Sequence, residues 1–237
     1  INKANNLKLI DKPSNIEKVL SLSNNIMNYT LKNKFYSSCN FEYLKNIFIV
    51  GLPRSGKTMT ESILECNKKL IKCGEDSALQ KAIKIYLKAK ENSLSPNLSK
   101  LYFDNIEANI CGKSFISTTN PMNFIYFGLI TSQMPKAKVI YCYRNPLDNI
   151  KEIYKKNMKN RHTYSCSIIE SAKLYIEVHS LMKEYQKTFN SKIYFLNYDN
   201  LVTNTGNEIE SLLYWLGWSN NPKYIEPNLD PSTIKLI

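Results

Sequence analysis

Residues 46–58 read Asn46-Ile47-Phe48-Ile49-Val50-Gly51-Leu52-Pro53-Arg54-Ser55-Gly56-Lys57-Thr58, and this stretch decides the fold. Its first five residues are mostly apolar and β-branched, a composition typical of a buried strand. The next eight satisfy the pattern Gly-x4-Gly-Lys-Thr of a phosphate-binding loop. In a strand–loop–helix unit of this kind, backbone N–H groups and the positive end of the helix dipole face an anion. The position directly after a buried strand favours this interpretation over an ordinary turn.

The rest of the chain continues the alternation of strands and helices. Apolar runs predict strands over 115–117, 138–143 and 192–196. Helical spacing and start signals predict helices at about 16–32, 58–64, 165–186 and 207–216, others opening at Pro121 and Pro146, and two or three within 77–110. This order predicts an α/β, P-loop-like three-layer fold, with a central parallel sheet flanked by helices. We expect an N-terminal helical segment over 1–45 and an α/β domain over 46–237.

The formal charge of +12 indicates an anionic partner, either a nucleic acid or a phosphorylated small molecule. No arginine-rich tail, zinc-finger spacing or RNA-binding motif accompanies the charge, so a small molecule is favoured and no nucleic acid is expected. Apolar runs are far shorter than the ~20 residues of a membrane-spanning helix, and no span is expected. The first residues lack the pattern of a signal peptide.

The six cysteines form no Cys-x-x-Cys pair, and two histidines are too few for a typical Cys/His zinc site. We expect free thiols in a cytoplasmic protein, although an even number also permits disulfides.

Arg144 follows the strand at 138–143, where a Walker-type ATPase would need an aspartate to hold Mg²⁺ through water. Asp199, near the end of the strand at 192–196, is displaced from that position, so no metal is expected. The carboxyl ends of parallel strands share one edge of a sheet, which predicts that Arg144 lies beside the phosphate loop. A guanidinium group there suits a second phosphate. Pairing of Arg144 with Asp148 at the helix start is the structural alternative.

Two segments resemble the sulfotransferases that use 3′-phosphoadenosine 5′-phosphosulfate (PAPS). Residues 48–58 look like the family's 5′-phosphosulfate loop, and 143–148, reading Tyr-Arg-Asn-Pro-Leu-Asp, look like its 3′-phosphate segment. The similarity is closest to bacterial tetratricopeptide-associated sulfotransferases and tyrosylprotein sulfotransferases, and shorter matches extend it over about 46–226. The resemblance implies transfer of a sulfuryl group from PAPS to an undefined hydroxyl acceptor without a metal. Adenosine 3′,5′-bisphosphate (PAP) is then the product.

The resemblance also assigns site residues by position. By this resemblance, the 5′-phosphosulfate of the donor nucleotide would be bound by residues of the loop: Arg54, Ser55, Gly56, Lys57 and Thr58. Arg144 would bind the 3′-phosphate, Lys156 would be a second basic residue, and Tyr198 would line the nucleotide site. Lys57, Glu75 and Arg54 are the candidate catalytic residues. Glu75 matches the general base of the tyrosylprotein enzymes, whereas the residues alone indicate only a loop carboxylate.

The chain departs from the family pattern at several places. Lys57 replaces a loop hydroxyl, Thr119 occupies the place of a catalytic lysine, and Glu152 stands where a serine binds the 3′-phosphate. The segment that closes over the nucleotide is expected to be cut short at the C-terminus. We interpret Lys57 as supplying the cation missing at Thr119. The alternatives are an inactive nucleotide-binding paralogue and a Walker A ATP-dependent kinase.

Overall fold

The chain forms a five-stranded sheet in which every pairing is parallel, and the strand order is β2-β3-β1-β4-β5. The computed structural model describes residues 1–32, 44–94, 96–106, 112–156, 158, 162–219 and 224. The strands are β1 (Lys45–Val50), β2 (Leu70–Lys72), β3 (Phe115–Thr118), β4 (Lys138–Tyr143) and β5 (Ile193–Asn197). The predicted α/β class with a central parallel sheet is confirmed.

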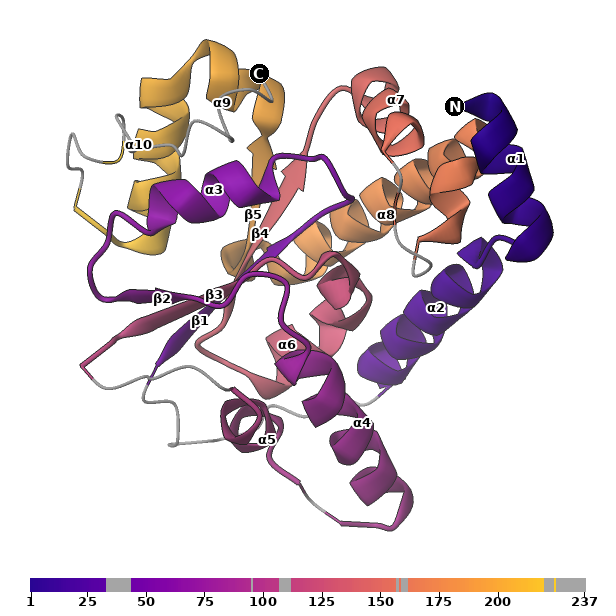
Figure 1. The fold of residues 1–237 in the computed structure, drawn as a ribbon. Helices are drawn as coiled ribbons and strands as arrows, with labels where there is room; N and C mark the ends of the chain where they lie inside the picture. The colour runs from indigo at the N-terminus through magenta and orange to yellow at the C-terminus, as the bar shows by residue number, and fades with distance from the viewer. Residues whose placement is uncertain are drawn as a thin grey trace.

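Helices cover both faces of this sheet (Figure 1). The α-helices are α1 (Asn2–Asp11), α2 (Ile16–Lys32), α3 (Lys57–Leu64), α4 (Ala78–Glu91), α5 (Leu98–Asp104), α6 (Phe127–Gln133), α7 (Pro146–Lys155), α8 (Ile168–Phe189), α9 (Tyr198–Thr203) and α10 (Thr205–Leu216). The described residues also form the 3₁₀ helices η1 (Pro121–Tyr126), η2 (Thr163–Cys166) and η3 (Asn190–Lys192).

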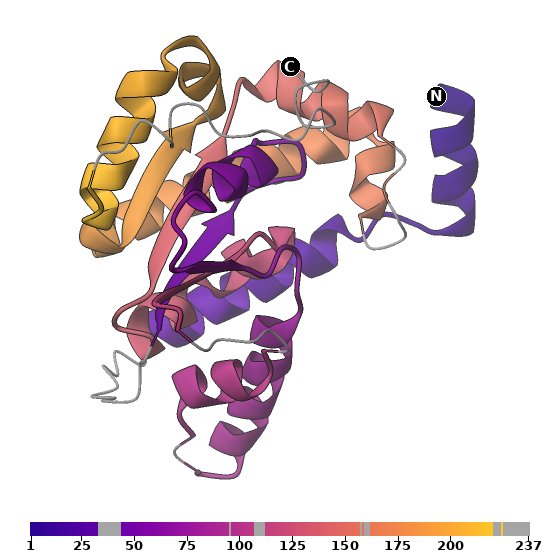
Figure 2. The same cartoon turned by 60° about the vertical axis from the view of Figure 1, so that its left-hand side comes forward.

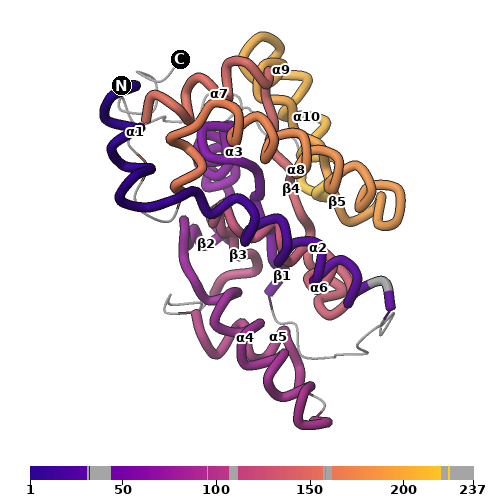
Figure 3. Tube along the Cα trace, turned by 90° about the vertical axis from the view of Figure 1, so that its right-hand side faces the viewer, coloured from indigo at the N-terminus to yellow at the C-terminus, as the bar shows by residue number. Residues whose placement is uncertain are grey.

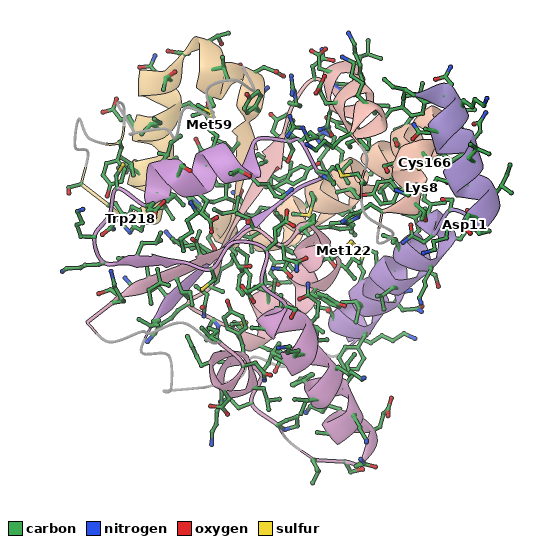
Figure 4. All side chains as sticks on the ribbon, in the orientation of Figure 1. Lys8, Asp11, Met59, Met122, Cys166 and Trp218 are labelled. Carbon is green, nitrogen blue, oxygen red and sulfur yellow. The ribbon has the colours of Figure 1, made fainter. Side chains whose placement is uncertain are left out.

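Side-chain alternation along the strands divides the core into two layers. Ile47 and Ile49 of β1 pack with the buried residues of α3, α9 and α10. Phe48 and Val50 point the other way and pack with α2, α4, α6 and α8. Figure 2 shows α3 and α10 on one side of the strands and α2 on the other. In Figure 4, Met59 of α3 and Met122 of η1 mark these two opposite layers.

Helix α2 is part of the main core, whereas α1 lies on the surface. Ile16, Val19 and Ile26 of α2 are buried in the same cluster as β1 and β4, and α2 runs beside α6 and α8 (Figure 3). Helix α1 buries no residue, and polar contacts hold it to α7. The Asn5 side-chain amide donates to the Tyr154 carbonyl at 3.2 Å, and the Tyr154 hydroxyl donates to Asn2 at 2.7 Å.

Several elements differ from the sequence predictions for local reasons. Helix α1 has no apolar face, β2 has three residues, and α9 has six, so none carries a periodic signal. The turn after Pro121 is a 3₁₀ helix that passes into α6, not an α-helix from its start. Helix α8 begins three residues later than predicted because Ser167 caps it, accepting from the Glu170 N–H at 3.3 Å.

Four of the six cysteines lie among the described residues, and Cys66, Cys73, Cys142 and Cys166 are all free thiols. Cys39 and Cys111 lie outside the described residues. Within the described part of the chain, no helix combines the length and apolar character needed to cross a bilayer.

The contact between α2 and α6 depends on the absence of a side chain at Gly128. A Cβ atom there would lie 2.5 Å from Thr30 Oγ1 and 2.9 Å from Thr30 Cγ2. We therefore expect Gly128→Ala to lower the free energy of unfolding by about 1–3 kcal/mol, the usual cost of overpacking a core. Urea denaturation measures this. The double variant Gly128→Ala/Thr30→Ala is the control and is expected to recover part of the loss; an unchanged or larger loss would contradict the packing.

Candidate functional site

Residues 51–56, which the sequence predicts to bind phosphate and which are called the phosphate loop below, connect β1 to α3 at the carboxyl edge of the sheet. Two glycines set the shape of this loop. Gly51 has φ +143°, and a Cβ atom there would lie 2.3 Å from the Cys142 carbonyl oxygen of β4. Gly56 has φ +96° and is the N-cap of α3, where a Cβ atom would lie 2.3 Å from the Tyr198 ring. Only glycine fits both close approaches. The loop is thereby held against the ends of β4 and β5.

Lys57 is the first residue of α3, and its side chain turns back beneath the loop. The ammonium group donates to the carbonyl oxygens of Gly51 at 3.0 Å and Leu52 at 2.9 Å, and the residue is only 6% exposed. Burial lowers the pKa of Lys57 to about 8, while the nearby Cys142 and Glu75 raise it. Lys57 therefore stabilises the loop conformation and places a buried positive charge against the loop backbone.

Ser55 and Asn149 carry buried polar atoms without a hydrogen-bond partner beside the loop. Ser55 is 2% exposed, and its hydroxyl has no partner. The Asn149 amide nitrogen donates to the Pro53 carbonyl at 2.9 Å, which ties α7 to the loop, but its Oδ1 atom is unpaired. Native proteins seldom leave such groups unsatisfied, and both atoms lie beside the loop that the sequence predicts to bind phosphate.

Arg144 lies at the end of β4, and Tyr198 contacts both this arginine and the loop. The Arg144 guanidinium carbon is 4.9 Å from the centroid of the Tyr198 ring, and a Cβ atom at Gly56 would lie 2.3 Å from the same ring. The Nε atom of Arg144 is buried and has no partner. Among the described residues no ion pair joins Arg144 to Asp148. The alternative prediction, that Arg144 pairs with Asp148 at the start of the helix, is therefore wrong.

Three contacts fix the turn that carries Arg144. The Tyr175 hydroxyl of α8 donates to the Arg144 carbonyl at 2.7 Å. The backbone N–H of Asn145 donates to the Asp199 carboxylate at 2.6 Å, and the Asn145 side chain caps α7 by accepting from the Leu147 N–H at 3.0 Å. Asp199 thus stabilises the turn between β4 and α7.

The ends of β2 and β3 build another part of this edge of the sheet. Glu75 follows β2, is exposed, and lies near enough to Lys57 to favour the charged form of that lysine. Thr119 follows β3, is buried, and its N–H donates to the Gly74 carbonyl at 2.7 Å. Glu75 therefore lies on the same edge as the phosphate loop.

Glu152 on α7 lies against the loop arginine. Its carboxylate is 4.0 Å from the Arg54 guanidinium and 3.3 Å from the Lys155 ammonium. Arg54 has φ +67°, a left-handed conformation that is uncommon outside glycine. Glu152 therefore partly neutralises the charge of the loop arginine.

The remaining predicted residues lie at the rim. Thr58, in the first turn of α3, and Lys156, the C-cap of α7, are both exposed. Glu61 of α3, Asn149, Tyr175 and Asp199 support the site and were not predicted. Of these four, Glu61 could have been found from its spacing in the sequence, because a residue four positions after Lys57 lies on the same face of α3.

A family model described as "Sulfotransferase family" matches residues 84–222, which is more than half of the chain and includes Arg144 and Tyr198. An Aquifex aeolicus protein described as uncharacterized is 27% identical over 187 residues, covering 70% of this chain and 25% of that protein. The chain thus spans about a quarter of the length of this curated relative.

Solved structures with the same fold include three sulfotransferases. The sulfotransferase domain of the Synechococcus olefin synthase has a TM-score of 0.59 at 14% identity, covering 84% of this chain and 86% of the domain. A Mycobacterium tuberculosis sulfotransferase has a TM-score of 0.54 at 12% identity, covering 87% and 75%. A mouse sulfotransferase complexed with PAP also has 0.54, at 14% identity, covering 81% and 65%. At these identities the likeness shows the fold.

The buried ammonium of Lys57 predicts a pH dependence of stability. Its pKa is about 8 in the folded chain and 10.5 for a lysine exposed to water, so the unfolded state binds more protons between these values. The contribution to unfolding free energy therefore rises with pH, by about 2 kcal/mol between about pH 7.5 and 9.5. Urea denaturation of the wild type and Lys57→Met at both pH values measures the difference. Equal pH responses of the two proteins would contradict the predicted pKa.

Proposed function

Because the chain belongs to the sulfotransferase family, we propose that it transfers a sulfuryl group from PAPS to a hydroxyl acceptor. The family and the fold support a transferase. The donor, the acceptor and the activity of this divergent chain are our proposal. PAP in the mouse structure supports PAPS as the donor.

One observation carries the proposal, the two buried unpaired donors on neighbouring strand ends. Ser55 Oγ follows β1 and Arg144 Nε follows β4, and these strands pair directly. The Tyr198 ring is close to both Gly56 of the loop and the Arg144 guanidinium. This donor set fits a nucleotide with phosphate groups at both ends of its ribose, which is the feature that distinguishes PAPS from ATP.

In the proposed complex the residues divide by the phosphate they hold. Arg54, Ser55, Gly56, Lys57 and Thr58 bind the 5′-phosphosulfate through side chains and the N-terminus of α3. Arg144 binds the 3′-phosphate, Lys156 adds charge at the end of α7, and Tyr198 lines the site.

Two residues are proposed to act on the reacting groups. PAPS supplies an activated sulfuryl group, and negative charge develops on the bridging oxygen when its bond to sulfur breaks. Lys57, whose ammonium has a third N–H beyond its two carbonyl contacts, stabilises that charge in place of a lysine at Thr119. Glu75 accepts the proton of the acceptor hydroxyl as the new sulfur–oxygen bond forms.

The proposal also includes the cellular location of the protein and its partners. Free thiols in four described cysteines support a cytoplasmic protein. The partners are PAPS, PAP and a hydroxyl-bearing acceptor.

The choice of nucleotide tests the proposal. Isothermal calorimetry is expected to show that PAP binds without Mg²⁺ and more tightly than ATP with Mg²⁺. Arg144→Ala is expected to weaken PAP binding by about 10- to 100-fold, the value of a charge-assisted contact, and to change binding of adenosine 5′-phosphate little.

Lys151→Ala, which removes an exposed lysine of α7, is the matched control and should leave PAP affinity within about twofold. Tighter binding of ATP that requires Mg²⁺ would favour the Walker A kinase. PAP binding without any turnover of PAPS would favour the inactive paralogue.

The pairing of Glu152 with Arg54 gives a further test. Glu152→Ser releases Arg54 and is expected to tighten PAP binding by about 2- to 5-fold at low salt, the scale of a partly exposed ion pair. Calorimetry at two salt concentrations should show the gain shrinking as salt rises. Asp148→Asn removes a charge from the same helix without touching Arg54. An equal gain from Asp148→Asn would show that only net charge matters.

A further inference from the structure

Glu61 is a buried carboxylate on the helix that begins at the phosphate loop. It lies one turn after Lys57 on α3 and is 2% exposed. Its Oε1 atom accepts from the Ser117 hydroxyl of β3 at 2.9 Å and from the Gly74 N–H at 3.4 Å. Burial raises the pKa of Glu61, which reflects the cost of placing a carboxylate there.

Gly74 is the residue before Glu75, and its backbone is held on both sides. Its N–H points to Glu61, while its carbonyl accepts from the Thr118 hydroxyl at 3.0 Å and the Thr119 N–H at 2.7 Å. Gly74 has φ +59° and has no atom within 4 Å of a Cβ position, so side-chain packing does not fix it. Hydrogen bonds therefore define the direction in which the chain leaves β2.

Glu61 thus joins the two halves of the site. Through α3 it belongs to the rigid unit that includes Lys57 and the phosphate loop. Through Gly74 and Ser117 it belongs to the ends of β2 and β3, which carry Glu75 and Thr119. An apolar residue at position 61 would fill the space, but the Gly74 N–H would lose its acceptor.

We propose that Glu61 is a positioning residue, which fixes the Gly74 peptide so that Glu75 is held at a set place relative to the phosphate loop. This rests on the proposed function for the role of Glu75. The contact itself does not depend on that function. Glu61 touches neither donor nor acceptor and acts through Gly74.

Hydrogen exchange of the whole chain, followed by mass spectrometry of peptides covering 70–78, tests the brace directly. Glu61→Ala is expected to speed exchange in 73–76 by about tenfold, because Gly74 loses an acceptor. Glu61→Gln retains a carbonyl oxygen at the same place and is expected to stay within about twofold of the wild type. Ser117→Ala keeps the carboxylate but removes one contact, with an expected increase of about threefold. Glu65→Ala, at the C-cap of the same helix and paired with Lys72 at the surface, is the matched control.

Binding and turnover distinguish positioning from general loss of structure. PAP affinity by calorimetry should stay within about twofold in Glu61→Ala, while release of PAP from PAPS, with water as acceptor, should fall about tenfold in kcat at unchanged KM. Rescue of kcat by Glu61→Gln is expected.

Unchanged exchange at 73–76 in Glu61→Ala would contradict the proposal that Glu61 positions the Gly74 peptide. Faster exchange throughout α3 together with loss of PAP binding would also contradict it, because the variant would then have lost structure in general. If the wild type itself binds no PAP, the proposed function fails, while the exchange comparison still decides whether Glu61 holds Gly74.

Discussion

The site depends on the close parallel pairing of β1 with β4, which brings the loop after one strand against the end of the other. Gly51 passes so near the Cys142 carbonyl that any side chain would collide with β4. Because the strands are parallel and adjacent, Arg144 emerges beside the loop instead of at the opposite edge. The sheet order then adds β5 and Tyr198 on one side and β3 with Thr119 on the other.

Positive charge in this site is held by several different means. Lys57 is buried and bonded to loop carbonyls, Arg54 is balanced by Glu152 on α7, and Arg144 lies over an aromatic ring. A buried lysine and a loop arginine would repel each other, and Arg54 indeed lowers the pKa of Lys57. The local cost is offset by hydrogen bonds within the loop and by the carboxylates of Glu75 and Glu152 nearby.

The same edge contains supports whose importance is clear only in three dimensions. Asp199 resembles a displaced metal ligand in the sequence, yet its carboxylate accepts the Asn145 N–H and holds the Arg144 turn. Tyr175 lies 31 residues after Arg144 and bonds its carbonyl. Glu61 gave a weak sequence signal as a helix neighbour of Lys57, but its partners Ser117 and Gly74 come from other elements.

The sequence alone was enough to predict the α/β class, the strand–loop–helix unit at 46–64 and the place of Arg144 at a strand end, because each depends on local pattern. An apolar strand followed by Gly-x4-Gly-Lys-Thr allows little else, and parallel topology follows from alternating strands and helices. Tertiary structure decided which groups are paired. It placed Glu152 against Arg54, Asp199 against Asn145 and Glu61 beneath Gly74. Such pairings join residues from separate elements, and their partners depend on packing distances that no sequence spacing encodes.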